Sequence, residues 1–152
     1  MTDVVDVKTR SRMMSSIRAK DTAPEYAVRR MLHRAGFRFR LHYAALAGKP
    51  DIVLPKYKAI ILVNGCFWHG HDCHLFKWPS SRSEFWHKKI NSTRERDMKN
   101  LEIYRGAGWR VMVVWECALR GKKRLDVSNI NEYLCAWLVG SESFNELFGR
   151  QP

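Results

Sequence analysis

The chain has 152 residues, 45% of them apolar, so it can bury a core of its own as one domain without disulfide bonds. Its 27 Lys and Arg residues outnumber 15 Asp and Glu residues, and the net charge of +12 favours a polyanionic partner, with nucleic acid the first candidate. A charge that serves only solubility or a membrane surface is the alternative, but no apolar stretch suits a signal peptide or a membrane span, which predicts a cytoplasmic protein.

No internal repeat and no linker rich in Pro, Gly or Ser interrupts the chain, so residues 21–152 are predicted to form a single domain after a basic arm, residues 1–20. Within the arm, Met14 and Ile17 lie among arginines on a short amphipathic segment. Such a segment suits a DNA groove, but it also fits an ordinary flexible terminus, and the sequence does not separate the two.

The first predicted helix covers residues 23–35, because Thr22 and Glu25 have the spacing of a capping box and Gly36 favours a stop. Its expected buried stripe consists of Val28, Met31 and Leu32.

Three strands are predicted next. Residues 37–43 alternate apolar with basic residues, as in a half-exposed strand, whereas residues 52–54 and 59–63 are continuous apolar runs typical of central strands. A polar segment from Thr93 to Gly106 is expected to be a helix.

A strand at residues 110–115 and an amphipathic helix at residues 127–139 complete the predicted elements. The expected order is therefore helix, three strands, helix, strand, helix. This order predicts an α/β sandwich with a central mixed β-sheet flanked by helices.

The segment Asn64–His74, which reads NGCFWHGHDCH, concentrates cysteine and histidine in a chain where disulfides are not expected. The predicted ligands of a structural Zn²⁺ ion are Cys66, His71, Cys73 and the distant Cys117. His74 in place of His71 is one alternative, and burial of the cysteines as small apolar side chains is another.

Asp51 begins a predicted buried strand directly after a proline, where a carboxylate is costly unless its charge is used. A Mg²⁺ ion would neutralise it, with the backbone carbonyl of Val63 as the second ligand. The scissile phosphate of a nucleic acid would complete the coordination of this ion, and His69 could act on that phosphate, oriented by Asp97 on the following helix. The alternatives are a turn-capping role for Asp51 and a zinc-binding or surface position for His69.

Four aromatic residues lie in predicted loops or at a helix start among lysines and arginines: Phe67, Trp68, Trp78 and Trp86. This arrangement favours stacking on bases or wedging between them. Large aromatic side chains are also commonly buried, and the sequence does not decide between these two roles.

Several motifs follow one another along nearly the whole chain: TRSRMM from Thr9, KPD ending at Asp51, GCFWH from Gly65, FKWP from Phe76, EFW from Glu84, ERD ending at Asp97, and WECALR from Trp115. In this order they closely resemble the very short patch repair (Vsr) endonucleases. The resemblance implies a restriction-endonuclease-like fold and an enzyme that nicks one DNA strand 5′ of the T in a T:G mismatch, the product of 5-methylcytosine deamination.

The resemblance also assigns roles to residues. It implies Mg²⁺ on Asp51, His69 as the general acid or base with Asp97 behind it, and Glu25 near the waters of the metal. It implies zinc on the Cys₃His set, and a wedge beside the mismatch made by Phe67, Trp68 and Trp86. Val63 and Asn64 stand where the family commonly has Thr and His, and because Asn64 cannot act as an acid or base, more weight falls on His69.

The partners implied by the resemblance are double-stranded DNA with a T:G mismatch, mismatch-repair proteins, and a DNA polymerase acting after the nick, in the nucleoid of a bacterial cell. Two other functions fit the sequence. A restriction-type endonuclease of the same fold would cut both strands of paired DNA. A non-catalytic zinc-containing DNA-binding module would have no use for Asp51 together with His69 and Asp97.

Overall fold

Five strands form one mixed sheet in the computed structural model, which describes residues 22–151. In spatial and chain order they are β1 (Arg40–Leu41), β2 (Ile52–Leu54), β3 (Ala59–Asn64), β4 (Arg110–Trp115) and β5 (Phe144–Leu147). The pairs β1–β2 and β2–β3 are antiparallel, whereas β3–β4 and β4–β5 are parallel. Each parallel pair is joined through helices, as the geometry of a crossover requires.

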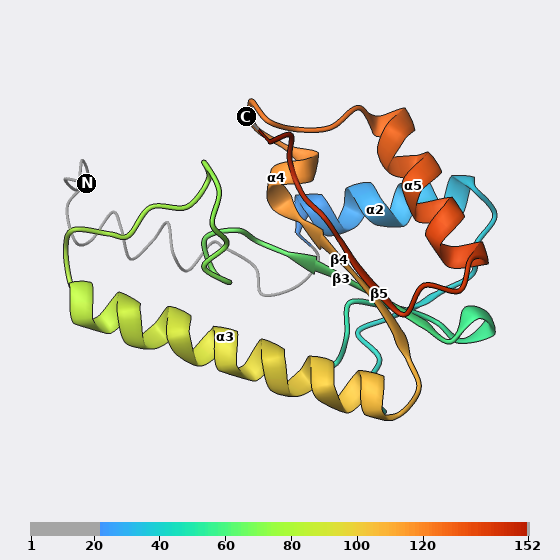
Figure 1. Ribbon diagram of the computed structural model, residues 1–152, viewed down its shortest axis with the longest axis horizontal. Coiled ribbons are helices and arrows are strands. Elements are labelled where there is room, and N and C mark those ends of the chain that lie inside the picture. Colours follow the sequence, from blue (N-terminus) through green and yellow to red (C-terminus); the bar gives the residue numbers. More distant parts are fainter. Residues whose placement is uncertain (1–21, 152) are drawn as a thin grey trace.

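Helices cover both faces of the sheet (Figure 1). On one face lie α2 (Ala23–Arg34), the short α4 (Glu116–Leu119) and α5 (Val127–Val139); on the other lies α3 (Ser83–Gly106). Side chains of β2 and β3 alternate between two buried clusters: Ile52 and Ile61 pack on the side of α2 and α5, and Ile60 packs with Tyr104 of α3. Burial on both faces explains the continuous apolar runs of these strands. The α/β sandwich with a mixed sheet is confirmed.

Several predicted boundaries are confirmed. The helix α2 starts after Thr22, whose hydroxyl accepts a hydrogen bond from the Glu25 backbone N–H at 3.4 Å. It ends before Gly36, which has a φ of +88°. Val28 and Leu32 are buried as predicted, while Met31 packs against the core from a half-buried position.

The predicted strand 37–43 is wrong in extent, since only β1 pairs and both of its residues are exposed. His42, with a φ of +46°, turns the backbone out of the extended conformation. The helix predicted from Thr93 begins ten residues earlier, at Ser83, because Trp86 and Ile90 continue its buried side. Helix α4 and strand β5 were not predicted from the sequence.

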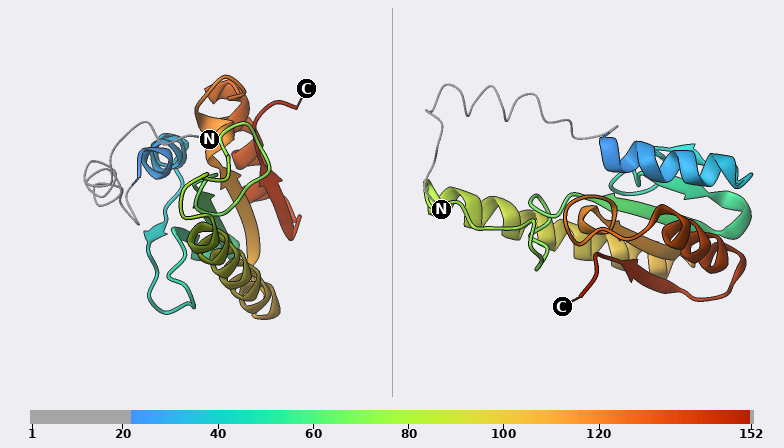
Figure 2. Two further views of the ribbon diagram at one scale, coloured as in Figure 1. Left: turned by 90° about the vertical axis from the view of Figure 1, so that its left-hand side faces the viewer. Right: turned by 90° about the horizontal axis from the view of Figure 1, so that it is seen from above.

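Beyond the edge of the sheet, the N-terminal half of α3 extends alongside the segment 65–82 that joins it to β3 (Figure 2). This projection carries most of the cysteine, histidine and aromatic residues of interest. The predicted basic arm, with Met14 and Ile17, lies outside the described residues. Among residues 22–151, no helix is both long and apolar enough to cross a membrane.

Candidate active site and metal centre

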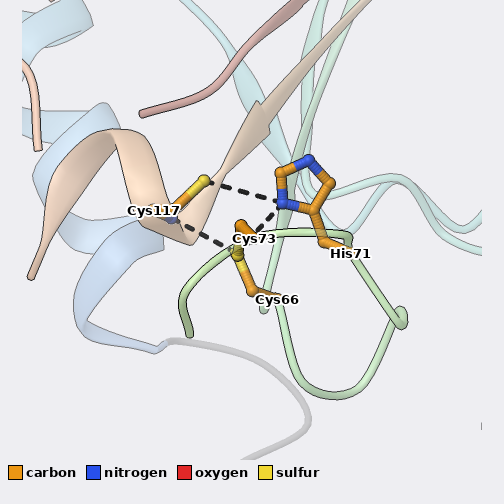
Figure 3. A group of neighbouring side chains, drawn as sticks. All are labelled: Cys66, His71, Cys73 and Cys117. Carbon is orange, nitrogen blue, oxygen red and sulfur yellow. Dashed lines mark hydrogen bonds between the residues drawn. The ribbon is translucent and has the colours of Figure 1, made fainter. Parts of the chain in front are cut away.

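The four predicted zinc ligands converge at the end of β3 (Figure 3). Cys66, His71 and Cys73 come from the loop after β3, and Cys117 comes from α4. Their ligand atoms all lie within 4.8 Å of one another, and His71 Nδ1 is 3.6 Å from the sulfur atoms of both Cys66 and Cys117. Tetrahedral zinc, with bonds of about 2.3 Å to sulfur and 2.0–2.1 Å to nitrogen, separates such ligands by about 3.6 Å. The four residues therefore fit a zinc ion, with Nδ1 as the ligand atom of His71.

The surroundings of this Cys₃His cluster suit a buried metal. Burial raises the pKa of the Cys66 and Cys117 thiols, and burial lowers the pKa of His71, whose ring stacks on Trp115 at 4.0 Å. Each of the two sulfur atoms accepts a backbone N–H at 3.3 Å, from Cys117 and Gly149 respectively, and these bonds would support thiolates. His74, the alternative ligand, lies beside Gly121 instead.

The cluster also connects distant parts of the chain. The Cys66 backbone N–H donates to Glu116 Oε1 at 3.1 Å, and Arg120 holds the other oxygen of Glu116 at 2.9 Å. The bond from Gly149 to Cys117 attaches the segment after β5. One metal at this point would therefore fix the loop after β3, helix α4 and the C-terminal segment together.

Asp51 lies at the start of β2, where its Oδ2 accepts the backbone N–H of Val63 at 2.8 Å. Burial raises the pKa of Asp51 to about 6; the negative charge of Glu25 adds to this, while the hydrogen bond from Val63 and the charges of two histidines oppose it. A buried carboxylate whose charge is disfavoured in this way gains most from a cation placed beside it.

Glu25 of α2 and His42, just after β1, complete a second group of potential ligands with Asp51, all of whose donor atoms lie within 4.8 Å of one another. Glu25 is only 2% exposed, and its Oε2 accepts a hydrogen bond from Arg29 Nη2 at 2.9 Å. The structure thus brings the predicted Glu25 and Asp51 together. Two neighbouring carboxylates, one buried and one half-buried, fit a divalent cation, which prefers oxygen ligands.

His42 and Arg29 were not among the predicted site residues. His42 reaches the site because its backbone N–H bonds the Asp51 carbonyl at 3.1 Å, a contact created by the pairing of β1 with β2. No motif marks it, since its neighbours in the sequence are exposed or half-buried. Arg29 follows Glu25 by one helical turn, and that i,i+4 spacing was the one available signal.

His69 and Asp97 form the pair that the sequence predicted. His69 Nδ1 is 2.5 Å from Asp97 Oδ2, which joins the loop after β3 to the middle of α3. Both line a cavity of about 340 Å³ that Asn64 also borders. The charge of His69 lowers the pKa of Asp51, so the histidine pair and the carboxylate group share one electrostatic neighbourhood.

Gly70, which follows His69, approaches α3 more closely than any side chain allows. Its φ is +61°, and a Cβ there would lie 2.6 Å from Arg94 Nε and 2.7 Å from the buried Ile90. Arg94 also donates a hydrogen bond to the Gly70 carbonyl. We expect Gly70→Ala to lower the free energy of unfolding by about 2–4 kcal/mol, measured by urea unfolding.

Gly36→Ala is the matched control for Gly70→Ala. Gly36 has a φ of +88°, but a Cβ added there would meet no atom within 4 Å, so it reports the backbone strain without the steric clash. Equal losses of unfolding free energy in Gly70→Ala and Gly36→Ala would show that close packing of the loop on α3 contributes nothing to stability.

The predicted wedge aromatics lie in contact with one another. The Phe67 ring centroid is 5.3 Å from those of both Trp68 and Trp86. Phe67 and Trp68 are half-buried, whereas Trp86 is only 6% exposed and packs behind them. A direct role for Trp86 in contacting bases stays a prediction, and in this conformation it supports the other two.

Comparison with known proteins gives concordant matches. A family model described as DNA mismatch endonuclease Vsr matches residues 2–75. The chain is 44% identical to DNA mismatch endonuclease Vsr of Escherichia coli (strain K12), over 92% of this chain and 90% of that protein. It is 46% identical to the Type II nicking enzyme V.XorIIP of Xanthomonas oryzae pv. oryzae, over 78% and 88%. It is 45% identical to the Type II nicking enzyme V.NmeAIP of Neisseria meningitidis serogroup A, over 80% and 87%.

Proposed function

Because this chain belongs to the Vsr family of DNA mismatch endonucleases, we propose that it nicks one DNA strand 5′ of the T in a T:G mismatch and so starts very short patch repair. The observation that carries the proposal is the meeting of Asp51 with Glu25, together with the His69–Asp97 pair, whose histidine acts electrostatically on Asp51. A module that only binds DNA has no use for these groups together. The similarity to two Type II nicking enzymes supports a single-strand cut over the double-strand cut of a restriction enzyme.

The proposed cofactors are a catalytic Mg²⁺ and a structural Zn²⁺. Mg²⁺ would be held by Asp51 and the backbone carbonyl of Val63, with Glu25 beside it, and would supply positive charge opposite the phosphate and make bound water more acidic. Zn²⁺ would be held by the Cys₃His cluster, which lies directly around His69 in the chain and keeps that residue in place.

The proton transfer is assigned to His69. Its Nδ1 is held by Asp97, so Nε2 is the nitrogen that faces the substrate and exchanges a proton with it. Asn64, which borders the same cavity, orients groups by hydrogen bonding but carries no titratable proton.

Asp97→Asn is expected to lower the nicking rate by about 100-fold, because the ring of His69 loses the carboxylate that fixes its tautomer and stabilises its charged form. Single-turnover kinetics on a mismatched duplex measures this. The matched control is Glu95→Gln, which removes one negative charge from an exposed position on the same helix. If Asp97→Asn cleaves the mismatched duplex at the wild-type rate, Asp97 has no part in catalysis.

Mismatch recognition is assigned to Phe67 and Trp68, supported by Trp86, with Met14 and Ile17 of the arm as further DNA contacts. Inserting an aromatic ring requires unstacking, which costs less at a poorly paired step. Trp68→Ala should therefore lower the ratio of nicking at T:G over T:A by about tenfold. Rates on the two duplexes at equal salt give this ratio, and an unchanged ratio would remove Trp68 from the wedge.

The function is tested with end-labelled duplexes that carry T:G or T:A in several methyltransferase-like contexts, with and without Mg²⁺. A single Mg²⁺-dependent nick 5′ of the mismatched T is the expected result. Cleavage of both strands, or equal cleavage of T:A, would replace the proposal with a restriction-type activity. No cleavage in any context would leave a DNA-binding module.

The remaining proposals concern the setting of the enzyme. We propose a restriction-endonuclease-like fold in which residues 21–152 form the nuclease domain and residues 1–20 form a DNA-contacting arm. Mismatch-repair proteins and a DNA polymerase that acts after the nick would be its partners. Its place would be the bacterial cytoplasm, in association with the nucleoid.

A further inference from the structure

We propose that His42 is a ligand of the catalytic metal ion, completing a Glu25–His42–Asp51 site that favours Mn²⁺ relative to Mg²⁺. The inference rests on the proposed function, because it names a further ligand of the same centre. Neither the motifs of the sequence nor the roles implied by the family resemblance include this residue.

The position of His42 is set by the backbone. Its N–H bonds the Asp51 carbonyl at 3.1 Å, and its left-handed conformation, with a φ of +46°, ends strand β1. The ring then reaches the buried carboxylate of Glu25, with Nε2 3.7 Å from Oε2. Two ligands about 2.1 Å from one octahedral cation lie between about 3.0 and 4.2 Å apart, so this separation suits a shared ion.

Arg29 shows which electron pair His42 presents to the site. Its Nη2 is 2.9 Å from Glu25 Oε2 and 3.1 Å from His42 Nε2. A guanidinium group can only donate hydrogen bonds, so Nε2 must carry the lone pair and accept. A metal ion needs the same lone pair. Arg29 therefore already places a positive group against two of the three proposed ligands, and a metal ion that binds them displaces it from His42.

The identity of the ligands predicts a preference among metals. Carboxylates and carbonyls suit Mg²⁺ and Mn²⁺ alike, whereas an imidazole nitrogen contributes more to the binding of transition metals. His42 should therefore raise the affinity for Mn²⁺ more than that for Mg²⁺. Replacement of His42 by Gln returns an oxygen donor of similar reach and should remove the difference.

The test measures metal binding directly, without DNA. Free Mn²⁺ is followed by electron paramagnetic resonance during titration of the zinc-loaded protein, and Mg²⁺ affinity is obtained by competition. We expect His42→Ala to weaken Mn²⁺ binding by about tenfold or more and Mg²⁺ binding by less, and His42→Gln to lower the Mn²⁺ affinity while Mg²⁺ affinity stays close to wild type. His33→Ala, at an exposed histidine of the same α2 helix, is the matched control.

Arg29→Gln supplies an opposite change, since removal of the competing guanidinium should tighten Mn²⁺ binding several-fold. Wild-type Mn²⁺ affinity in the folded His42→Ala protein would overturn the inference, whatever the result with Arg29. Nicking of T:G duplexes is measured separately. Normal Mn²⁺ binding by His42→Ala together with T:G nicking by the wild type would refute the inference alone, whereas His42-dependent Mn²⁺ binding without any nicking would refute only the proposed function.

Discussion

Replacing Asp51 with Asn should lower the nicking rate at a T:G mismatch by about 10³-fold or more, while DNA affinity stays the same or rises slightly. The half-buried Asp51 carboxylate accepts the Val63 N–H at the start of β2, where its proposed task is to hold the metal ion. Asn can still accept the bond from the Val63 N–H, so the local backbone should be kept. The loss then reflects charge, because size and hydrogen bonding change little.

The same variant should be more stable than the wild type in buffer without Mg²⁺. Burial raises the pKa of Asp51 from 3.8 to about 6, so the folded protein holds this proton more tightly than the unfolded chain does. Ionisation of Asp51 therefore lowers the stability of the folded protein. This loss is absent below the pKa of Asp51 in the unfolded chain, grows between the unfolded and folded pKa values, and is complete above the folded pKa. A difference of about two pH units, at 1.36 kcal/mol each, makes Asp51→Asn up to about 3 kcal/mol more stable at pH 7.

Urea unfolding at pH 7 and pH 3.5 checks this sign, since the gain at neutral pH should vanish in acid. Chelators are avoided because they would also remove zinc. Asp126→Asn is the control for charge alone, since Asp126 is exposed and makes no side-chain bond to helix α5. Asp51→Asn that nicks at the wild-type rate, or that is less stable at pH 7, would contradict a buried metal-binding carboxylate.

The parts of this site that the sequence predicted share a local signal. Asp51 is recognisable because it interrupts apolar residues directly after a proline, and the Cys₃His set is recognisable because three of its members lie within eight residues. Each pattern can be read from a short window, and the structure brings the four members of the Cys₃His set together and places Asp51 in a separate group with Glu25. The apolar runs 52–54 in β2 and 59–63 in β3 were equally clear, since burial on both faces of the sheet leaves no polar residue within them.

The parts that were missed depend on contacts between distant segments. His42 joins Asp51 only through the pairing of β1 with β2. The strand predicted over residues 37–43 was too long, because only Arg40 and Leu41 pair and both of their side chains are exposed. The strand β5 has no strong alternation and is held by its parallel neighbour β4. The start of α3 lacks a side-chain cap, because Arg82 in a left-handed conformation precedes it. Tertiary packing, which a local pattern does not contain, decided each case.

The second large effect is expected at the zinc cluster. Cys117→Ser should abolish zinc binding, lower nicking to background and open the segment 65–82 to proteolysis. Cys117 is the one ligand outside the loop, and its sulfur also accepts the Gly149 N–H, so its loss separates the loop from α4 and from the C-terminal segment. The five-stranded sheet should remain, because its core lies elsewhere. Far-ultraviolet circular dichroism and metal analysis distinguish local from global unfolding.

Cys135→Ser is the matched control, because this cysteine lies on α5, bonds only weakly to Asn131 at 3.9 Å and is not a member of the cluster. Proton release gives an independent check. Burial raises the pKa of the Cys66 and Cys117 thiols, so both are protonated at pH 7 without zinc, whereas burial lowers the pKa of His71, which is then already neutral. Zinc uptake should therefore release at least about two protons, and affinity should rise with pH accordingly. Full zinc content in Cys117→Ser, or uptake without proton release, would show that these thiols do not bind the metal.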